Sequence, residues 1–285
     1  MPSLIDIRRR IRSVKNTQQI TKAMKMVSAA KLRRAQDRVI ASRPYAALLR
    51  KVLGNVAAAV VSDELAGQNP LLARREEKHI LLVLITADKG LAGAFNTNLI
   101  KGAQRFSGEH GGAEVTLELI GRKGRDFFRK RAVPITGEYL GMAKVQYEDA
   151  VAIGQKLMDR FRNEEIDAVY LLYNEFKSVM AQRVTFAQVL PMELPKQTEP
   201  VDFIFETPVL EMLGSLLPRY VESELYRALL ESAAAEHAAR MTAMDAATSN
   251  AAEMIDTLTL YMNRVRQASI TKEIIEVVSG AAAAE

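Results

Sequence analysis

The feature that most constrains this chain is a run of 61 residues, 219–279, that contains neither proline nor glycine. Helices of ordinary globular domains run roughly 8–20 residues. As one α-helix the run would extend about 90 Å, at about 1.5 Å per residue. No compact domain in a chain of 285 residues needs so long a helix. We therefore expect a protruding rod that reaches, braces or transmits.

The first sixty residues predict a second long helix. No glycine precedes Gly54, and no proline lies between Pro2 and Pro44. One stripe advances in alternating steps of three and four residues, the spacing of a coiled-coil seam, and it turns polar as it advances. Its members are Leu4, Ile7, Ile11, Val14, Gln18 and Thr21. We expect helix over residues 4–60, with any kink at Pro44.

Charge is distributed unevenly between the two predicted helices. Residues 1–60 carry 14 Lys and Arg against 2 Asp and Glu, whereas residues 209–285 carry a net charge of −5. A long helix at each end of a chain most simply folds back as an antiparallel pair. The opposite charges favour that pairing, although each exposed ion pair contributes only about 0.5 kcal/mol.

The middle of the chain alternates between strand and helix signals. Continuous apolar runs at 79–85, 114–121 and 166–176 are typical of strands buried on both faces. Helices are predicted at 93–106, 122–131 and 149–163, a short strand at 133–139, and a hairpin partner at 182–191. This alternation predicts a parallel-rich, Rossmann-like α/β domain. The predicted fold is thus α/β plus long helices, with domains at 1–60, 75–205 and 209–285.

Composition excludes several classes of site. The chain has no cysteine, which excludes disulfides and thiolate metal ligands. Its three histidines form no spaced cluster, so we expect no metal site and no cofactor. The N-terminus lacks the apolar core of a secretory signal, and no stretch approaches about 18 consecutive apolar residues. We expect a soluble chain with no membrane span.

Four features could carry chemistry. The turn at 88–93 follows a buried strand, where an α/β sheet would hold a phosphate, but it lacks phosphate-loop spacing and reads as a tight turn. The basic groups at 8–12 and 31–34 favour a solvated or protein-facing helix surface over nucleic acid, because no aromatic residue lies among them. His237 reads as a lone helical histidine. The polar stretch 264–276, inside an otherwise seam-bearing helix, is a candidate partner contact.

Taken together, these residues resemble the gamma subunits of bacterial F-type rotary ATP synthases. The resemblance covers the whole chain and is concentrated in four strings at its two ends. They are NTQQITKAMKMVSAAKLRRAQ (16–36), SRPYA (42–46), RYVESELYRALLESAAAEHAARMTAMDAATSNA (219–251) and RQASITKEIIEVVSGA (266–281). In the middle, LITADKGLAGAFNTNL (84–99) matches as clearly. His237 departs from the family's usual Gln, which we expect to be neutral.

The resemblance implies a central rotor shaft formed by an antiparallel coiled coil, with the α/β domain beside its foot. The implied partners are three alpha and three beta subunits around the shaft, the epsilon subunit, and the c ring of the membrane sector. The shaft would couple proton flow through the c ring to ATP synthesis or hydrolysis at the beta subunits. This chain would be non-catalytic and peripheral, on the cytoplasmic face of the plasma membrane, without nucleic acid.

The resemblance also implies roles for individual residues. Seven residues match family positions that take part in energy coupling or in contact with the beta subunits: Met24, Lys25, Arg240, Arg266, Gln267, Thr271 and Glu273. Arg266 and Gln267 would bond an acidic beta-subunit loop in a contact that forms and breaks each turn. A basic shaft face of Lys22, Lys31, Arg33 and Arg34, with Lys25, would meet acidic beta-subunit segments. The small apolar tip beyond Val277 would turn in a low-friction collar.

Two other functions remain open from the sequence. One is a nucleic-acid or membrane-surface binder that uses the basic N-terminal arm, which steeply salt-dependent binding would favour. The other is an α/β enzyme with helical dimerisation arms, which ATP hydrolysis by the chain alone would favour. The sequence leaves open whether the coupling ion is proton or sodium, the c-ring size, the rest angle of the shaft, the strength of epsilon inhibition and the role of His237.

Overall fold

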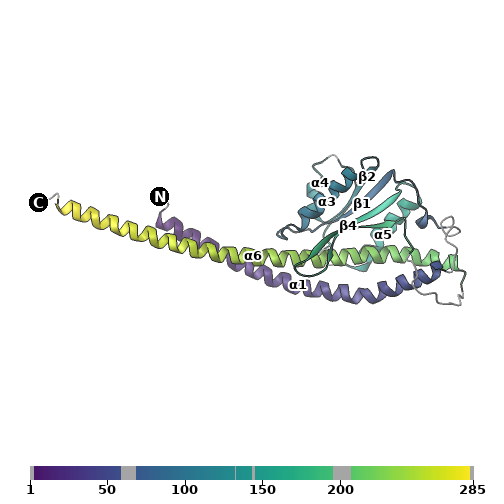
Figure 1. Ribbon diagram of the computed structural model, residues 1–285, viewed down its shortest axis with the longest axis horizontal. Helices are drawn as coiled ribbons and strands as arrows, with labels where there is room; N and C mark the ends of the chain where they lie inside the picture. Colours follow the sequence, from purple (N-terminus) through teal and green to yellow (C-terminus); the bar gives the residue numbers. More distant parts are fainter. Residues whose placement is uncertain (1–2, 59–68, 132, 143–144, 195–206, 283–285) are drawn as a thin grey trace. The chain divides into compact units, whose positions relative to one another are not determined.

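The computed structural model of the chain describes residues 3–58, 69–131, 133–142, 145–194 and 207–282. The chain divides into two units, one of residues 1–28 with 241–285 and one of residues 29–240. Two long helices, α1 (Leu4–Ala58) and α6 (Val209–Ala282), run through both units. The α/β elements lie between them in sequence and belong to the second unit (Figure 1).

The two long helices confirm the predictions made from the missing glycines and prolines. Helix α6 is continuous over 74 residues and includes the entire run 219–279. Helix α1 is continuous over 55 residues and contains Pro44, whose side chain is exposed. The predicted seam is also correct: Ile7 and Thr21 are buried, and the other four members of the stripe are partly buried.

A five-stranded sheet organises the second unit, in the order β3-β2-β1-β4-β5. Strand β1 (His79–Ile85) pairs in parallel with β2 (Glu114–Ile120) on one side and with β4 (Ala168–Phe176) on the other. Strand β3 (Ile135–Tyr139) extends the parallel part, and β5 (Gln182–Leu190) joins β4 as an antiparallel hairpin. The predicted strands and their parallel-rich pairing are therefore confirmed.

The core of the second unit lies against this sheet. Side chains on one face of β1, such as Leu82 and Leu84, pack with Leu99 and Phe106 of helix α3 (Phe95–Glu109). Side chains on the opposite face of β1, such as Val83, are equally buried. Both faces of the central strands are covered, and this explains why they read as continuous apolar runs rather than alternating ones. Helix α4 (Arg122–Phe128) adds Phe128 to the same cluster.

Helix α5 (Tyr147–Arg162) packs closely on α6. A capping box formed by Gln146 and Asp149 fixes its start. Gly154 faces Glu222 of α6, where an added Cβ would lie 3.5 Å from the Glu222 Cγ. The Tyr147 hydroxyl donates a hydrogen bond to the Glu222 carboxylate at 3.1 Å. These contacts hold α5 and α6 together as part of one unit.

Within the second unit, α6 is buried on nearly every side between residues 221 and 240. Even charged side chains of this segment, such as Glu231 and Arg240, are buried, and α6 lies beside α1 and the α/β elements here (Figure 1). Ala235 is fully buried and packs, with the half-buried Ala239, against the sheet core. The small residues thus bring α6 close to the α/β domain.

Candidate functional site

In the first unit, α1 and α6 are joined by polar contacts at the level where the predicted seam becomes polar. The hydroxyls of Thr21 and Thr248 lie 2.8 Å apart, and the Lys25 ammonium lies 2.5 Å from the Asp245 carboxylate. Both members of the ion pair are half exposed, so the pair contributes little to stability. Met24 is half-buried beside Lys25 on the same turn of α1. Two predicted coupling residues, Met24 and Lys25, therefore lie at this contact.

This contact can be tested by cross-linking, because the chain contains no cysteine of its own. The two hydroxyl oxygens lie 2.8 Å apart, so cysteines at the same positions would bring their sulfur atoms near the bonding distance of about 2.05 Å. We expect Thr21→Cys with Thr248→Cys to form an intrachain disulfide on mild oxidation, seen as a faster band on a non-reducing gel. Thr17→Cys with Thr248→Cys, one helical turn away, is the matched control and should remain reduced. Equal cross-linking of both pairs would contradict the observed register.

The end of α6 extends past the start of α1 within the first unit (Figure 1). Every residue from 271 to 279 is exposed. Five large aliphatic side chains between residues 270 and 279 have 47–72% of their surface exposed: Ile270, Ile274, Ile275, Val277 and Val278. Apolar side chains gathered on a projecting segment mark a protein-binding surface. We call residues 264–279 the projecting segment.

The remaining predicted contact residues of α6 lie on this projecting segment. Arg266 and Gln267 are exposed, and their side chains form no hydrogen bond with any residue in the described ranges. The Thr271 hydroxyl donates to the Gln267 carbonyl at 2.9 Å, and Glu273 accepts a hydrogen bond from Ser269 at 3.2 Å. The structure thus leaves the Arg266 guanidinium and the Gln267 amide available to a partner.

Arg240 lies elsewhere, in the second unit, and is only 8% exposed. Its guanidinium donates to the backbone carbonyls of Lys89 and Gly90, at 3.3 and 3.2 Å, and pairs with Glu236 at 2.6 Å. It also lies 3.4 Å from the ring Nδ1 of His237. Arg240 therefore attaches the loop after β1 to helix α6, a contact between residues about 150 positions apart that the sequence could not predict.

Burial shapes the protonation of this cluster. It raises the pKa of the Glu236 carboxyl, and the charge of Arg240 opposes that shift. Burial, together with the nearby charges of Arg240 and Lys31, lowers the pKa of His237 to about 4. His237 is therefore neutral at pH 7, and a neutral ring nitrogen can accept a hydrogen bond from Arg240. The ring therefore adds no charge beside Arg240, while the expectation that the replacement of the family's usual Gln has no effect on function stays a prediction.

The predicted basic face is divided between the two units. Lys22 belongs to the first unit, whereas Lys31, Arg33 and Arg34 belong to the second. All four side chains are exposed, and none forms an ion pair with a residue in the described parts of the chain. Lys31 additionally lines a pocket formed by the ends of β1 and β2 and by α6. Sequence reasoning missed this pocket, although the turn at 88–93 pointed to the correct end of the sheet.

Two classes of feature are absent from the described ranges. No group of three or more His, Asp or Glu side chains there lies close enough together to hold a metal ion. No helix in those ranges is both long enough and apolar enough to cross a membrane.

Comparison with known proteins decides the family. Residues 3–284 match the family described as ATP synthase. The ATP synthase gamma chain of Solibacter usitatus is 77% identical over 286 residues, covering the whole of both chains. This chain belongs to the ATP synthase gamma chain family. Gamma chains from Anaeromyxobacter sp. (strain Fw109-5) and Pelotomaculum thermopropionicum are 52% and 50% identical, over 99% and 100% of both chains.

Solved structures agree with that membership. A chain of the central stalk and c ring of the Tetrahymena thermophila mitochondrial ATP synthase is 27% identical, with a TM-score of 0.58, over 80% of this gamma chain and 99% of that chain. A rotor chain of the Euglena gracilis mitochondrial ATP synthase, 18% identical, has a TM-score of 0.63 over 94% and 98% of the two chains. At that identity the second match shows the fold alone, an α/β domain with long terminal helices.

Proposed function

We propose that this chain is the central rotor shaft of a bacterial F-type ATP synthase. In this role it couples proton flow through the c ring to ATP synthesis or hydrolysis at the beta subunits. It also regulates the ATPase activity and the proton flow. The observation that supports this most strongly is the 77% identity, over the full length of both chains, to a bacterial ATP synthase gamma chain. The contact between α1 and α6 and the projecting segment of α6, both within the first unit, are consistent with a shaft.

The projecting segment is the part of the shaft that enters the ring of three alpha and three beta subunits. Its exposed aliphatic side chains suit an apolar collar, and the guanidinium of Arg266, which is unpaired within the described ranges, suits an acidic beta-subunit loop. A charged group of this kind forms hydrogen bonds of about 1.5–3 kcal/mol with a carboxylate. We propose that Arg266, Gln267, Thr271 and Glu273 make contacts of this kind, which form and break in each turn.

The basic side chains of α1 serve the same ring. Lys22, Lys31, Arg33 and Arg34 are exposed and form no ion pair with a residue of the described ranges, so they can attract the acidic segments of beta subunits. Long-range attraction of this kind steers partners into contact more than it adds affinity. We propose that Met24 and Lys25 influence coupling at the contact between α1 and α6, and that Arg240 does so where α6 meets the loop after β1. The epsilon subunit and the c ring would bind the α/β domain and the foot.

Catalysis is proposed to reside in the beta subunits, with this chain as a non-catalytic subunit on the cytoplasmic face of the membrane. The alternative of a nucleic-acid or membrane-surface binder gains no support from the relatives found, which are ATP synthase gamma and rotor chains. ATP hydrolysis by the purified chain alone would contradict the proposed division of labour.

Co-purification tests the proposal directly. Affinity isolation of this chain from its native membranes should recover alpha, beta and epsilon subunits together with ATPase activity. The oxidised Thr21→Cys, Thr248→Cys variant should retain that activity, because the two helices turn together and the disulfide joins no moving parts. An isolated, active homodimer would contradict the proposal. Loss of activity on oxidation, regained on reduction, would show that the two helices move against each other.

A further inference from the structure

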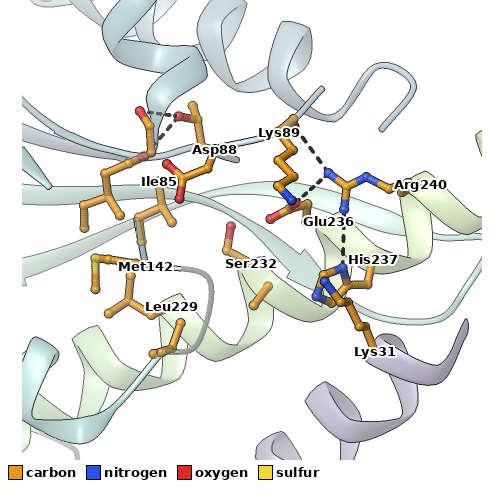
Figure 2. A pocket seen from close by; sticks show the side chains of 15 residues that line it. Lys31, Ile85, Asp88, Lys89, Met142, Leu229, Ser232, Glu236, His237 and Arg240 are labelled. Atoms are coloured by element: carbon orange, nitrogen blue, oxygen red, sulfur yellow. Dashed lines mark hydrogen bonds and ion pairs between the residues drawn. The ribbon is translucent and has the colours of Figure 1, made fainter. Parts of the chain in front are cut away.

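The pocket beside α6 has features of a small-molecule site. Its volume is about 130 Å³, and it lies where β1 and β2 end, against helix α6 (Figure 2). The carboxyl ends of parallel strands are the usual ligand-binding edge of an open α/β sheet. Gly121 allows this edge to close, since it has φ +94° and an added Cβ would lie 2.1 Å from the Thr86 carbonyl oxygen. The pocket is therefore built by the fold of one unit.

Ser232 supplies an unused hydrogen-bonding group in this pocket. It is only 3% exposed, and its hydroxyl forms no hydrogen bond with any residue in the described ranges. A serine or threonine inside a helix commonly donates to the carbonyl four residues earlier, as Thr248 and Thr259 do in this helix. The Ser232 hydroxyl instead points into the space beneath the strand ends (Figure 2). The hydroxyl therefore lines the pocket and is available to a bound ligand.

The charges around the pocket favour an anion of single charge. Two carboxylates line it, Asp88 and Glu236, with three cations, Lys31, Lys89 and Arg240. Glu236 and Arg240 neutralise each other at 2.6 Å. His237 is neutral at pH 7 because burial and two nearby cations lower its pKa to about 4. One positive charge remains in excess, and a monoanion would balance it.

Four apolar side chains form another part of the lining, which favours a ligand with an apolar part over a purely polar anion. Ile85, Ile120, Leu229 and Met142 form this part of the wall. Burying apolar surface stabilises a bound alkyl group, by an amount roughly proportional to the area removed from water. A cavity of about 150 Å³ holds a ligand the size of benzene, with six heavy atoms. The volume here therefore suits a ligand of similar size.

From these four features we propose that the pocket binds a short-chain organic monocarboxylate. Its carboxylate accepts hydrogen bonds from the Ser232 hydroxyl and the Lys89 ammonium, and its alkyl chain lies against Ile85 and Leu229. Such a ligand would connect α6 to the ends of β1 and β2 within the second unit. The proposal concerns binding by this unit and does not depend on the rotor role.

Butyrate, which has six heavy atoms, is the probe of choice for the full-length chain. Binding is measured by ligand-observed NMR, and by the rise in the melting temperature that a ligand specific for the folded state produces. Butyrate should bind saturably, and 1-butanol, butylamine and inorganic phosphate should each bind at least about tenfold more weakly. Butanol binding as tightly as butyrate would reduce the site to an apolar cavity. Tighter phosphate binding would reduce it to a general anion site, and either result would overturn the proposal.

Variants locate the binding within the pocket. Ser232→Ala and Lys89→Met should each weaken butyrate binding about tenfold or more, because each removes one hydrogen bond to a charged group. Ser249→Ala, an exposed serine on the same helix, is the matched control and should bind butyrate like the unmodified chain. The absence of saturable binding, or equal binding by all three variants, would overturn the proposal.

Discussion

Replacing Arg240 by alanine is expected to lower the free energy of unfolding of the second unit by about 3 kcal/mol or more. The substitution leaves the largely buried Glu236 carboxylate without its partner, and removing one member of a buried ion pair typically costs about 3–5 kcal/mol. It also leaves the carbonyls of Lys89 and Gly90 without the guanidinium that now donates to them. Denaturant unfolding of the full chain measures the loss.

The loss should depend on pH in a defined direction. Burial raises the pKa of Glu236 in the folded chain, and without Arg240 that shift becomes larger. A carboxyl whose folded pKa is raised destabilises the folded state once the pH exceeds its ordinary value, and the full effect is reached above the folded pKa. The loss caused by Arg240→Ala should therefore be greatest near neutral and alkaline pH, and smallest below the usual carboxyl range.

A double-substitution cycle separates the ion pair from the loop contacts. Arg240→Ala combined with Glu236→Gln removes both charges of the ion pair. The double variant should therefore be more stable at pH 8 than Arg240→Ala alone. Hydrogen exchange of the backbone amides at residues 89–91 should be faster in both variants than in the unmodified chain, because both lack the hydrogen bonds from Arg240 to the loop carbonyls. Equal stability of the single and double variants at pH 8 would show that the ion pair is not the dominant effect.

The second large effect is expected on the projecting segment. Arg266→Ala combined with Gln267→Leu should lower ATP synthesis by the complex about tenfold or more, since hydrogen bonds to charged groups contribute about 1.5–3 kcal/mol each. Both side chains are exposed and unbonded within the described chain, so the variant should fold and assemble normally. ATP synthesis by reconstituted vesicles measures the effect, alongside the amount of assembled complex.

Asn250→Leu provides the matched control for this variant. Asn250 is an exposed amide on the same helix, outside the projecting segment, and its replacement should leave synthesis unchanged. A single charge crossing about 100 mV supplies about 2.3 kcal/mol, so a few ions per step exceed the energy of any one contact. Individual contacts such as those of Arg266 and Gln267 should thus adjust the turnover rate. The paired helices, because they are stiff, should transmit the torque. Normal ATP synthesis by the Arg266→Ala, Gln267→Leu variant would show that these two side chains are not needed for coupling.

The sequence predicted those parts of the fold that depend on local pattern. The missing breakers predicted α1 and α6, and the steps of three and four placed Ile7 and Thr21 on the buried seam. Continuous apolar runs predicted β1, β2 and β4, because strands covered on both faces need no polar alternation. The projecting segment was also visible, since polar groups crowd a helix where a seam would otherwise continue.

The features that the sequence could not predict depend on tertiary contacts between distant residues. Arg240 bonds backbone carbonyls, which carry no side-chain identity and so leave no pattern to read. Ser232 and the ends of β1 and β2 form a pocket only after the sheet and α6 have packed together.

Rotation of single complexes tests the central claim most directly. The chain contains no cysteine, and Met180, at the turn between β4 and β5, has 85% of its surface exposed. Met180→Cys therefore provides one attachment site for a bead, on complexes whose alpha and beta subunits are fixed to a surface. The shaft account predicts that the bead turns continuously in one direction while ATP is hydrolysed. A bead that remains still in complexes hydrolysing ATP at the normal rate would contradict it.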